Sequence, residues 1–215
     1  MNGKPIVHVV DDDADFRKSV SRLLHLSGFE TAQYASAGQL LEQFDPDAPG
    51  CVLLDLDMPQ LNGLQLQARL TELDAPLSIV FLSGRGTIPA SVKAIKAGAE
   101  DFLCKPIMKQ QLIEAVERAI ARNQKTHEVR AKADEFHARF ESLTPREKQV
   151  YERVITGKLN KQIAYELSTT ERTIKAHRHN VMAKFQARSV LELVWMSERV
   201  TTLNSPQTGP SASTL

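Results

Sequence analysis

Carboxylate, hydroxyl and amino side chains stand directly after short apolar runs in the first half of this 215-residue chain. They are Asp11, Asp12, Asp13, Asp55, Ser83 and Lys105. Clustered carboxylates repel one another unless a cation lies among them, and hard oxygen ligands favour Mg²⁺. A carboxylate can attack phosphorus to form an acyl phosphate, while a metal ion and a lysine neutralise the equatorial oxygens. If these side chains meet, they predict phosphoryl transfer to an aspartate, with Ser83 donating a hydrogen bond to the phosphoryl group.

The elements that would bring these side chains together are short apolar runs alternating with amphipathic stretches. The strand candidates are Ile6–Val10, Phe29–Tyr34, Cys51–Leu54, Ile79–Leu82 and Asp101–Cys104. Apolar residues at helical spacing predict a helix from about Phe16 to Gly28 and further helices at about 37–44, 64–73, 88–97 and 108–122. Strict alternation predicts an α/β fold with a doubly wound, parallel five-stranded sheet and helices on both faces. Ligands of such sheets bind beyond the carboxyl ends of the strands, where the polar side chains fall.

Composition and charge limit the class of protein. A hydrophobic content of 42% is enough for packed cores. No apolar run is long enough to cross a membrane, and the N-terminus has no export signal, so the cytoplasm is expected and no membrane partner is. Cys51 and Cys104 have no metal-binding or redox spacing. Residues 1–123 hold 12 Lys/Arg against 16 Asp/Glu, and residues 124–215 hold 15 against 10, which hints that the second half faces nucleic acid.

The second half is predicted to be helical and compact. Thr144, Pro145 and Glu147 have the pattern of a capping box at a helix start, and Gly157 ends that helix. Asn160 is expected to cap a second helix, and Thr170 a third that reaches about residue 185. A fourth helix is expected at about 189–197. The second and third helices, joined by a tight turn and with cations on the latter, predict a helix-turn-helix.

Apolar side chains of these helices are assigned to a core or to a partner. Ile174, Val181 and Phe185 should face the core. In the fourth helix, the expected core residues are Leu191, Val194 and Trp195, and those expected to remain for a dimer contact are Leu193, Met196 and Val200.

The polar segment 123–141 is expected to be a helical linker between the two halves. Its apolar stripe repeats in a 4-3-4-3 rhythm at Val129, Ala133, Phe136, Phe140 and Leu143. The stripe fits two alternatives, which are packing on a neighbouring domain and a short coiled coil between two chains. We therefore expect domains at 1–122 and 142–200, the linker at 123–141, and a disordered tail at 201–215.

The first half resembles the receiver domain of two-component response regulators over about residues 4–122. The resemblance lies in the segments VVDDD, LLDLDMPQLNG, FLSGRG and KAGAEDFLCKP and in their spacing. It implies a flavodoxin-like sheet with strand order 2-1-3-4-5. It also implies that Asp55 accepts phosphate from a sensor histidine kinase.

The resemblance assigns roles to the other pocket residues. Asp11 and Asp12 would hold Mg²⁺ together with Asp55 and the backbone carbonyl of Asp57. Lys105 would pair with the phosphoryl group, and its peptide bond to Pro106 would be cis. Ser83 would be the switch hydroxyl and Phe102 the aromatic side chain that turns inward with it. The side chains of Asp57 and Arg85 would flank the path of the attacking water, or be solvated loop charges.

The segment 142–199 resembles the LuxR-type DNA-binding domain, through its Asn-Lys-x-Ile-Ala and Thr-Ile-Lys-x-His sequences. The whole chain is thus similar to the FixJ-like group of response regulators. The base-facing residues implied are Lys175, Ala176 and His179, and the phosphate contacts are Lys161, Thr170 and Thr173. Arg178 is expected on or beside that outward face. His177 fits either a phosphate contact or a partly buried, hydrogen-bonded histidine.

The function expected from these resemblances is a transcription regulator whose only catalysis is phosphoryl transfer and dephosphorylation at Asp55. Phosphorylation would promote a homodimer and binding to promoter DNA, and RNA polymerase is a further partner that this interpretation allows. One alternative is constitutive DNA binding that Asp55 only modulates. Another is a haloacid-dehalogenase-like phosphatase that uses Asp55 and Asp57 as its D-x-D pair, although Met58 and Pro59 follow in place of that family's usual Thr or Val.

Overall fold

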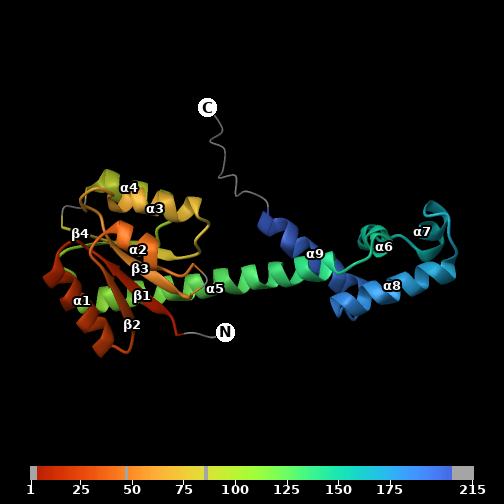
Figure 1. The fold of residues 1–215 in the computed structure, drawn as a ribbon, viewed down its shortest axis with the longest axis horizontal. Helices are drawn as coiled ribbons and strands as arrows, with labels where there is room; N and C mark the ends of the chain where they lie inside the picture. Colours follow the sequence, from red (N-terminus) through yellow and green to blue (C-terminus); the bar gives the residue numbers. More distant parts are fainter. Residues whose placement is uncertain (1–3, 47, 85–86, 205–215) are drawn as a thin grey trace. The chain divides into compact units, whose positions relative to one another are not determined.

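The computed structural model describes residues 4–46, 48–84 and 87–204, with side chains as far as residue 199. The chain forms two compact units, Met1–Glu128 and Val129–Leu215 (Figure 1). None of the described helices is long and apolar enough to cross a membrane.

The first unit is a five-stranded parallel sheet. Its strands are β1 Ile6–Val10, β2 Glu30–Tyr34, β3 Gly50–Asp55, β4 Ser78–Ser83 and β5 Asp101–Cys104. They lie in the order β2-β1-β3-β4-β5, and every neighbouring pair is parallel. The predicted doubly wound sheet and its strand order are therefore confirmed, with strand ends shifted by no more than a residue.

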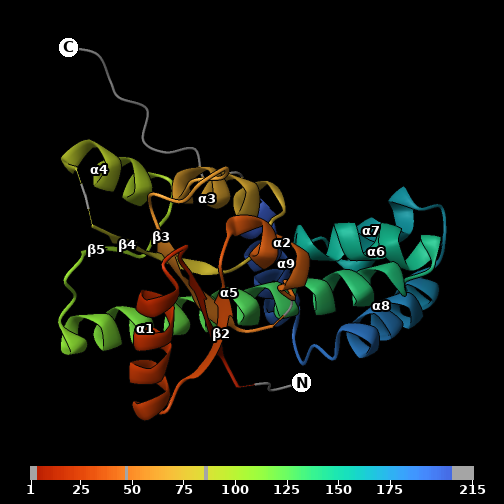
Figure 2. The ribbon, with the colours of Figure 1, turned by 60° about the vertical axis from the view of Figure 1, so that its left-hand side comes forward.

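Helices cover both faces of this sheet (Figure 2). They are α1 Ala14–Leu26, α2 Ala37–Gln43, α3 Gly63–Glu72, α4 Ile88–Lys96 and α5 Lys109–Glu141. Successive strand residues point to opposite faces. Val7 and Val9 accordingly pack in a cluster with α1 and α5, while Val10 packs in a second cluster with α2, α3 and α4.

Helix α5 is one continuous helix of 33 residues, so the expected helix at 108–122 and the linker helix at 123–141 are a single element. Asn123 in its middle is fully buried. Its Oδ1 accepts from the backbone N–H of Gly50 at 2.8 Å, and its Nδ2 donates to the carbonyl of Pro76 at 2.7 Å. Further along, Phe136 and Phe140 pack against the core of the second unit, and Leu143 is buried in it. This end of the stripe therefore packs on its own domain core.

The second unit contains α6 Pro145–Ile155, α7 Asn160–Glu166, α8 Glu171–Phe185 and α9 Val190–Asn204. Thr144 and Glu147 form the predicted capping box, and Thr170 caps α8. The predicted cap of α7 is wrong by one residue. Leu159 holds the cap position, and its backbone N–H donates to Gln162 at 2.8 Å. Asn160 is the first helical residue, and its Oδ1 instead accepts from Arg178 at 3.0 Å.

The assignment of α9 side chains is also wrong. Leu193, expected to be free for a dimer, is fully buried, whereas Leu191 and Trp195 are 57% and 59% exposed. Val194 and Met196 are half-buried, and the side chain of Val200 lies outside the described residues. Helix α9 extends to Asn204, four residues into the expected tail, and residues 205–215 lie outside the described part.

Candidate functional site

The carboxyl ends of three strands bring Asp11, Asp55 and Lys105 together. Asp11 follows β1, Asp55 ends β3 and Lys105 follows β5. The Lys105 Nζ lies 2.6 Å from Asp11 Oδ2 and 2.7 Å from Asp55 Oδ1. Both carboxylates are buried, and the Lys105 side chain is only 21% exposed. The Lys105–Pro106 peptide bond is cis, as expected.

The electrostatics of this pocket are set by burial and by one shared cation. Burial raises the pKa of Asp55, although its hydrogen bond from Lys105 acts in the opposite direction. Burial tends to lower the pKa of Lys105, but the hydrogen bonds and charges of Asp11 and Asp55 outweigh it and raise that pKa. One ammonium thus faces two buried carboxylates, which leaves the pocket with excess negative charge.

The loop after β3 holds the Asp55 carboxylate from its other side. The backbone N–H of Asp57 donates to Asp55 Oδ2 at 3.0 Å. At Gly63, the first residue of α3, a Cβ would lie 2.5 Å from the backbone oxygen of Asp55 and 2.9 Å from the Phe81 ring. Only glycine allows this approach, because a side chain would displace the backbone that carries Asp55.

An open cavity of about 740 Å³ lies over this edge of the sheet. It is lined by Asp55, Leu56, Asp57, Asn62, Leu64, Gly84, Thr87, Ala90 and Lys105. Asn62 and Thr87 were not expected here, because they are the N-caps of α3 and α4 and only the fold shows that these helix starts face the pocket. The cavity leaves Asp55 accessible to a phosphoryl donor from solvent.

The residues expected to bind metal are only partly assembled. Asp11 and Asp55 lie close enough together to share the Lys105 ammonium, and two carboxylates placed in this way can also share a divalent cation. Asp12 and the Asp57 side chain are exposed. Within the described residues, no group of three or more acidic, histidine or cysteine side chains is arranged to hold a metal ion. Asp13, the third residue of the acidic triplet and not one of the expected ligands, caps α1 by accepting from the backbone N–H groups of Asp15 and Phe16.

The two expected switch residues lie close to the pocket. Ser83 ends β4 and is buried, and its backbone oxygen accepts from the Lys105 N–H at 2.8 Å. Phe102 is half-buried and stacks on Phe81, with ring centroids 6.0 Å apart. Arg85 lies outside the described residues.

In the second unit, the base-facing residues expected on α8 form an exposed stripe. Lys175, Ala176 and His179 are all exposed, as is Lys161 on α7. Thr170 and Thr173 lie at the start of α8 with their hydroxyl oxygens 2.9 Å apart. A helix presents residues three and four apart on one face, so Lys175, Ala176 and His179 share one face of α8.

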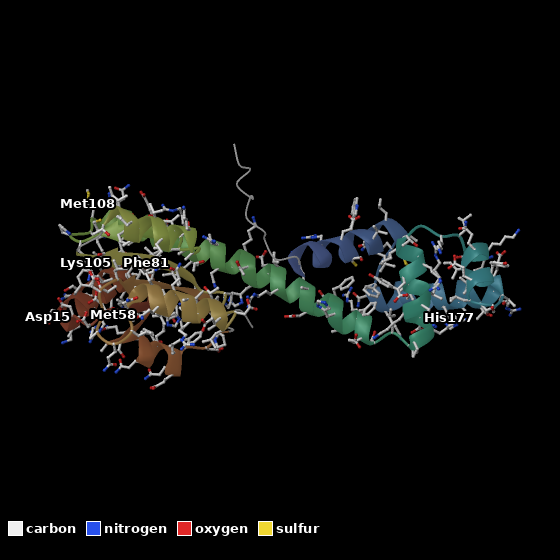
Figure 3. All side chains as sticks on the ribbon, turned by 90° about the horizontal axis from the view of Figure 1, so that it is seen from above. Asp15, Met58, Phe81, Lys105, Met108 and His177 are labelled. Carbon is white, nitrogen blue, oxygen red and sulfur yellow. The ribbon has the colours of Figure 1, made fainter. Side chains whose placement is uncertain are left out.

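Two other α8 residues are only partly exposed, which departs from the expectation for Arg178 and matches one of the two alternatives for His177. The guanidinium of Arg178 binds Asn160 of α7 and is half-buried, so it ties the two helices together. His177, labelled in Figure 3, is also half-buried.

Sequence reasoning missed Arg172, which is exposed and makes no ion pair among the described residues. It lies three residues before Lys175, and helical spacing could have placed it on the same face.

The C-terminal end of α8 is fixed by charged residues of other segments. Arg139 of α5 donates to the backbone oxygen of Phe185. The Lys184 Nζ binds the Ser142 carbonyl and Glu147 Oε2, at 2.7 and 2.8 Å. This hydrogen bond from Lys184, together with those at the α6 cap, lowers the pKa of Glu147 to about 2. The exposed face of α8 is therefore carried by a helix anchored at its far end.

The fold and the two sites define a class of protein. A flavodoxin-like unit with an acidic pocket at its strand ends is joined to a helix-turn-helix unit with an exposed cationic helix. The pattern for the response regulator receiver domain matches residues 7–117, and that for bacterial regulatory proteins of the luxR family matches residues 141–197.

Individual proteins are similar in sequence to this chain over nearly its whole length. The chain is 42% identical to nodulation protein W of Bradyrhizobium diazoefficiens, over 91% of this chain and 86% of that protein. It is 41% identical to the transcriptional regulatory protein FixJ of Rhizobium meliloti, over 89% of this chain and 94% of that protein. The solved structure of the response regulator StyR matches with a TM-score of 0.83 and 42% identity, covering 92% of this chain and all of that one. The chain therefore belongs to the response regulators that carry a receiver and a LuxR-type DNA-binding domain, and it is a transcription regulator.

Proposed function

We propose that a sensor histidine kinase phosphorylates Asp55 in the presence of Mg²⁺, and that this controls homodimerisation and sequence-specific binding to promoter DNA. The convergence of Asp11, Asp55 and Lys105 at one edge of the sheet is the observation that carries this proposal. Because promoter DNA is the ligand, the bacterial cytoplasm is the place of action.

The transfer forms one bond and breaks one. A carboxylate oxygen of Asp55 attacks the phosphorus of a phosphohistidine, an O–P bond forms, and the P–N bond breaks with its electron pair left on the imidazole nitrogen. Asp57 N–H orients the attacking carboxylate through Oδ2. Lys105 meets the charge on the phosphoryl oxygens. Asp11, Asp12, Asp55 and the Asp57 carbonyl would hold Mg²⁺, which would supply further neutralisation of that charge.

The effect of phosphorylation then has to reach the DNA-binding domain in the second unit. We expect Ser83 and Phe102 to transmit the change in the pocket to the rest of the domain. The Ser83 carbonyl accepts a hydrogen bond from the Lys105 N–H, and Phe102 lies on β5, the strand that pairs with β4. The phosphatase alternative gains no support, because the Asp57 side chain is exposed and its backbone, rather than its carboxylate, contacts Asp55.

On DNA, Lys175, Ala176 and His179 are proposed to contact base edges. Lys161, Thr170, Thr173 and the newly recognised Arg172 are proposed to contact phosphates. Arg178 is proposed as an internal tie because Asn160 already binds its guanidinium. RNA polymerase remains a proposed partner downstream of DNA binding.

The test is phosphorylation of the full chain by acetyl phosphate, read as a mass increase on the peptide that contains Asp55. We expect labelling only with Mg²⁺, none in Asp55→Asn, and tighter promoter binding by the labelled protein. Labelling of Asp55→Asn at another aspartate would overturn the acceptor. Equal DNA affinity before and after labelling would favour the constitutive alternative.

A further inference from the structure

The Lys105 ammonium has a third neighbour in addition to its two carboxylates. Its Nζ lies 3.9 Å from the centroid of the Phe16 ring. A cation over an aromatic face is attracted by the ring quadrupole, and the attraction grows when the cation is shielded from water. Lys105 is largely shielded, since its side chain is 21% exposed. The ring therefore closes the ammonium from a direction that Asp11 and Asp55 leave open.

The ring is held firmly in this place. Phe16 lies in the first turn of α1, and its backbone N–H donates to the Asp13 cap at 3.1 Å. The ring is half-buried and packs against the apolar cluster shared by α1 and α5. The third residue of the acidic triplet thus fixes the start of the helix that carries the ring.

The ring differs from the carboxylates in what competes for it. A divalent cation at the pocket would take oxygen atoms of Asp11 and Asp55, which are the present partners of Lys105. A phenyl ring offers no oxygen ligand to such a cation. The Phe16 contact can therefore persist when the carboxylates are engaged elsewhere.

We propose that Phe16 is a positioning residue for phosphoryl transfer, whose ring keeps the Lys105 ammonium over the pocket when metal and phosphoryl group occupy the carboxylates. This inference rests on the proposed phosphorylation of Asp55. It predicts that the rate depends on the electron density of the ring as well as on its shape.

The experiment replaces Phe16 by mono-, di- and trifluorinated phenylalanine, which keep the ring's shape and weaken its quadrupole. Phe29 is the matched control, because it packs against the same cluster and no cation lies over its ring among the described residues. We measure the rate constant of Asp55 phosphorylation by acetyl phosphate. A second readout, in metal-free protein, is the rate at which an amine-reactive ester modifies Lys105, quantified by peptide mass spectrometry.

We expect the phosphorylation rate to fall stepwise with fluorination at Phe16, by about two- to fivefold in total, and the modification of Lys105 to rise in the same order. The Phe29 series should change neither rate. Phe16→Leu should behave like the most fluorinated ring, and Phe16→Trp should keep the wild-type rate.

Flat rates across the Phe16 series, or equal effects in the Phe29 series, would overturn the inference, since packing alone would then explain the role of Phe16. Slower phosphorylation without faster Lys105 modification would overturn it too. Failure of the proposed function is distinguishable, because the wild-type protein would then take no label at Asp55.

Discussion

In the receiver pocket Lys105 is largely buried and paired with two buried aspartates, whereas on α8 Lys175 and His179 are exposed and make no ion pair among the described residues. Buried charges are costly unless paired, so the pocket's charges depend on one another for stability. Exposed charges cost the fold little and remain available to a polyanion, whose counterions they displace. The ion pairs inside the pocket can therefore be rearranged when a new charge enters it. The exposed cations of the DNA-binding domain can form new ion pairs with an external polyanion.

The first way to break this comparison is Lys105→Ala. It leaves Asp11 and Asp55 buried without a counter-ion, so the free energy of unfolding of the first unit should fall by about 2–3 kcal/mol in metal-free buffer, with part restored by Mg²⁺. Hydrogen exchange at β1 and β3 in the full chain measures this. Lys18→Ala, at an exposed position on α1, is the control and should change stability by no more than about 0.5 kcal/mol. An equal change in both variants would contradict the prediction.

Substitutions on the exposed faces of α7 and α8 should change the affinity for DNA and leave the free energy of unfolding almost unchanged. Lys175→Ala and His179→Ala should each weaken a selected DNA site by about 1–3 kcal/mol, with a smaller loss on random DNA. Lys161→Ala should weaken both about equally, because it is expected to meet phosphate. Fluorescence anisotropy at fixed salt gives both affinities. Equal losses on both DNAs for Lys175→Ala would make Lys175 a phosphate contact.

Glu147 tests whether burial and pairing, and not the domain, decide how a charge affects stability, because it is a buried and paired charge inside the DNA-binding domain. Its pKa of about 2 lies below the ordinary value of 4.5, so between these pH values the unfolded chain binds a proton that the folded unit does not. Stability of the second unit should therefore fall as the pH drops through that window. We expect about 1 kcal/mol, discounted because Lys184 is one-third exposed. Urea titrations followed by Trp195 fluorescence should show this part of the slope disappear in Glu147→Gln, and an unchanged slope would contradict its origin.

The smallest effect is expected at Arg172. Removing one phosphate contact in Arg172→Ala should lower the slope of log affinity against log salt by about one, with little change in sequence preference. Arg178→Ala is the matched control, because its guanidinium is bound to Asn160 and should leave that slope unchanged. If Arg178→Ala lowered this slope more than Arg172→Ala, Arg178 would be a DNA contact after all.

The sheet and the pocket could be predicted because parallel topology places strand ends together whatever lies between them. Apolar runs ending in Asp55, Ser83 and Lys105 were enough to place these residues at one edge. What the sequence could not reveal was which partner each polar group chooses. Asp13 serves a helix start, and Arg178 serves Asn160, because the nearest available partner is decided by the folded backbone.

Helix α9 shows a different limit. Its first turns contain Val190, Leu191, Leu193, Val194, Trp195 and Met196. With apolar side chains on nearly every side, spacing alone cannot define the buried face. The fit of Leu193 into the core around Phe185 decides the orientation, and that fit depends on residues far away in the sequence.

Asn123 has a consequence for how the receiver can be separated from the rest of the chain. Its amide joins the start of β3 to the carbonyl of Pro76, across 73 and 47 residues of sequence. A chain cut after residue 122, the boundary that the sequence suggested, would lack this side chain and leave the Gly50 N–H and the Pro76 carbonyl without it. Of these two groups the Gly50 N–H is the buried one, and a buried N–H without a partner costs about 1–3 kcal/mol, a sizeable share of the stability of a small domain. During synthesis the same hydrogen bonds can form only after residue 123, about four turns into α5, has left the ribosome, so the receiver cannot complete its fold before that part of the shared helix has emerged.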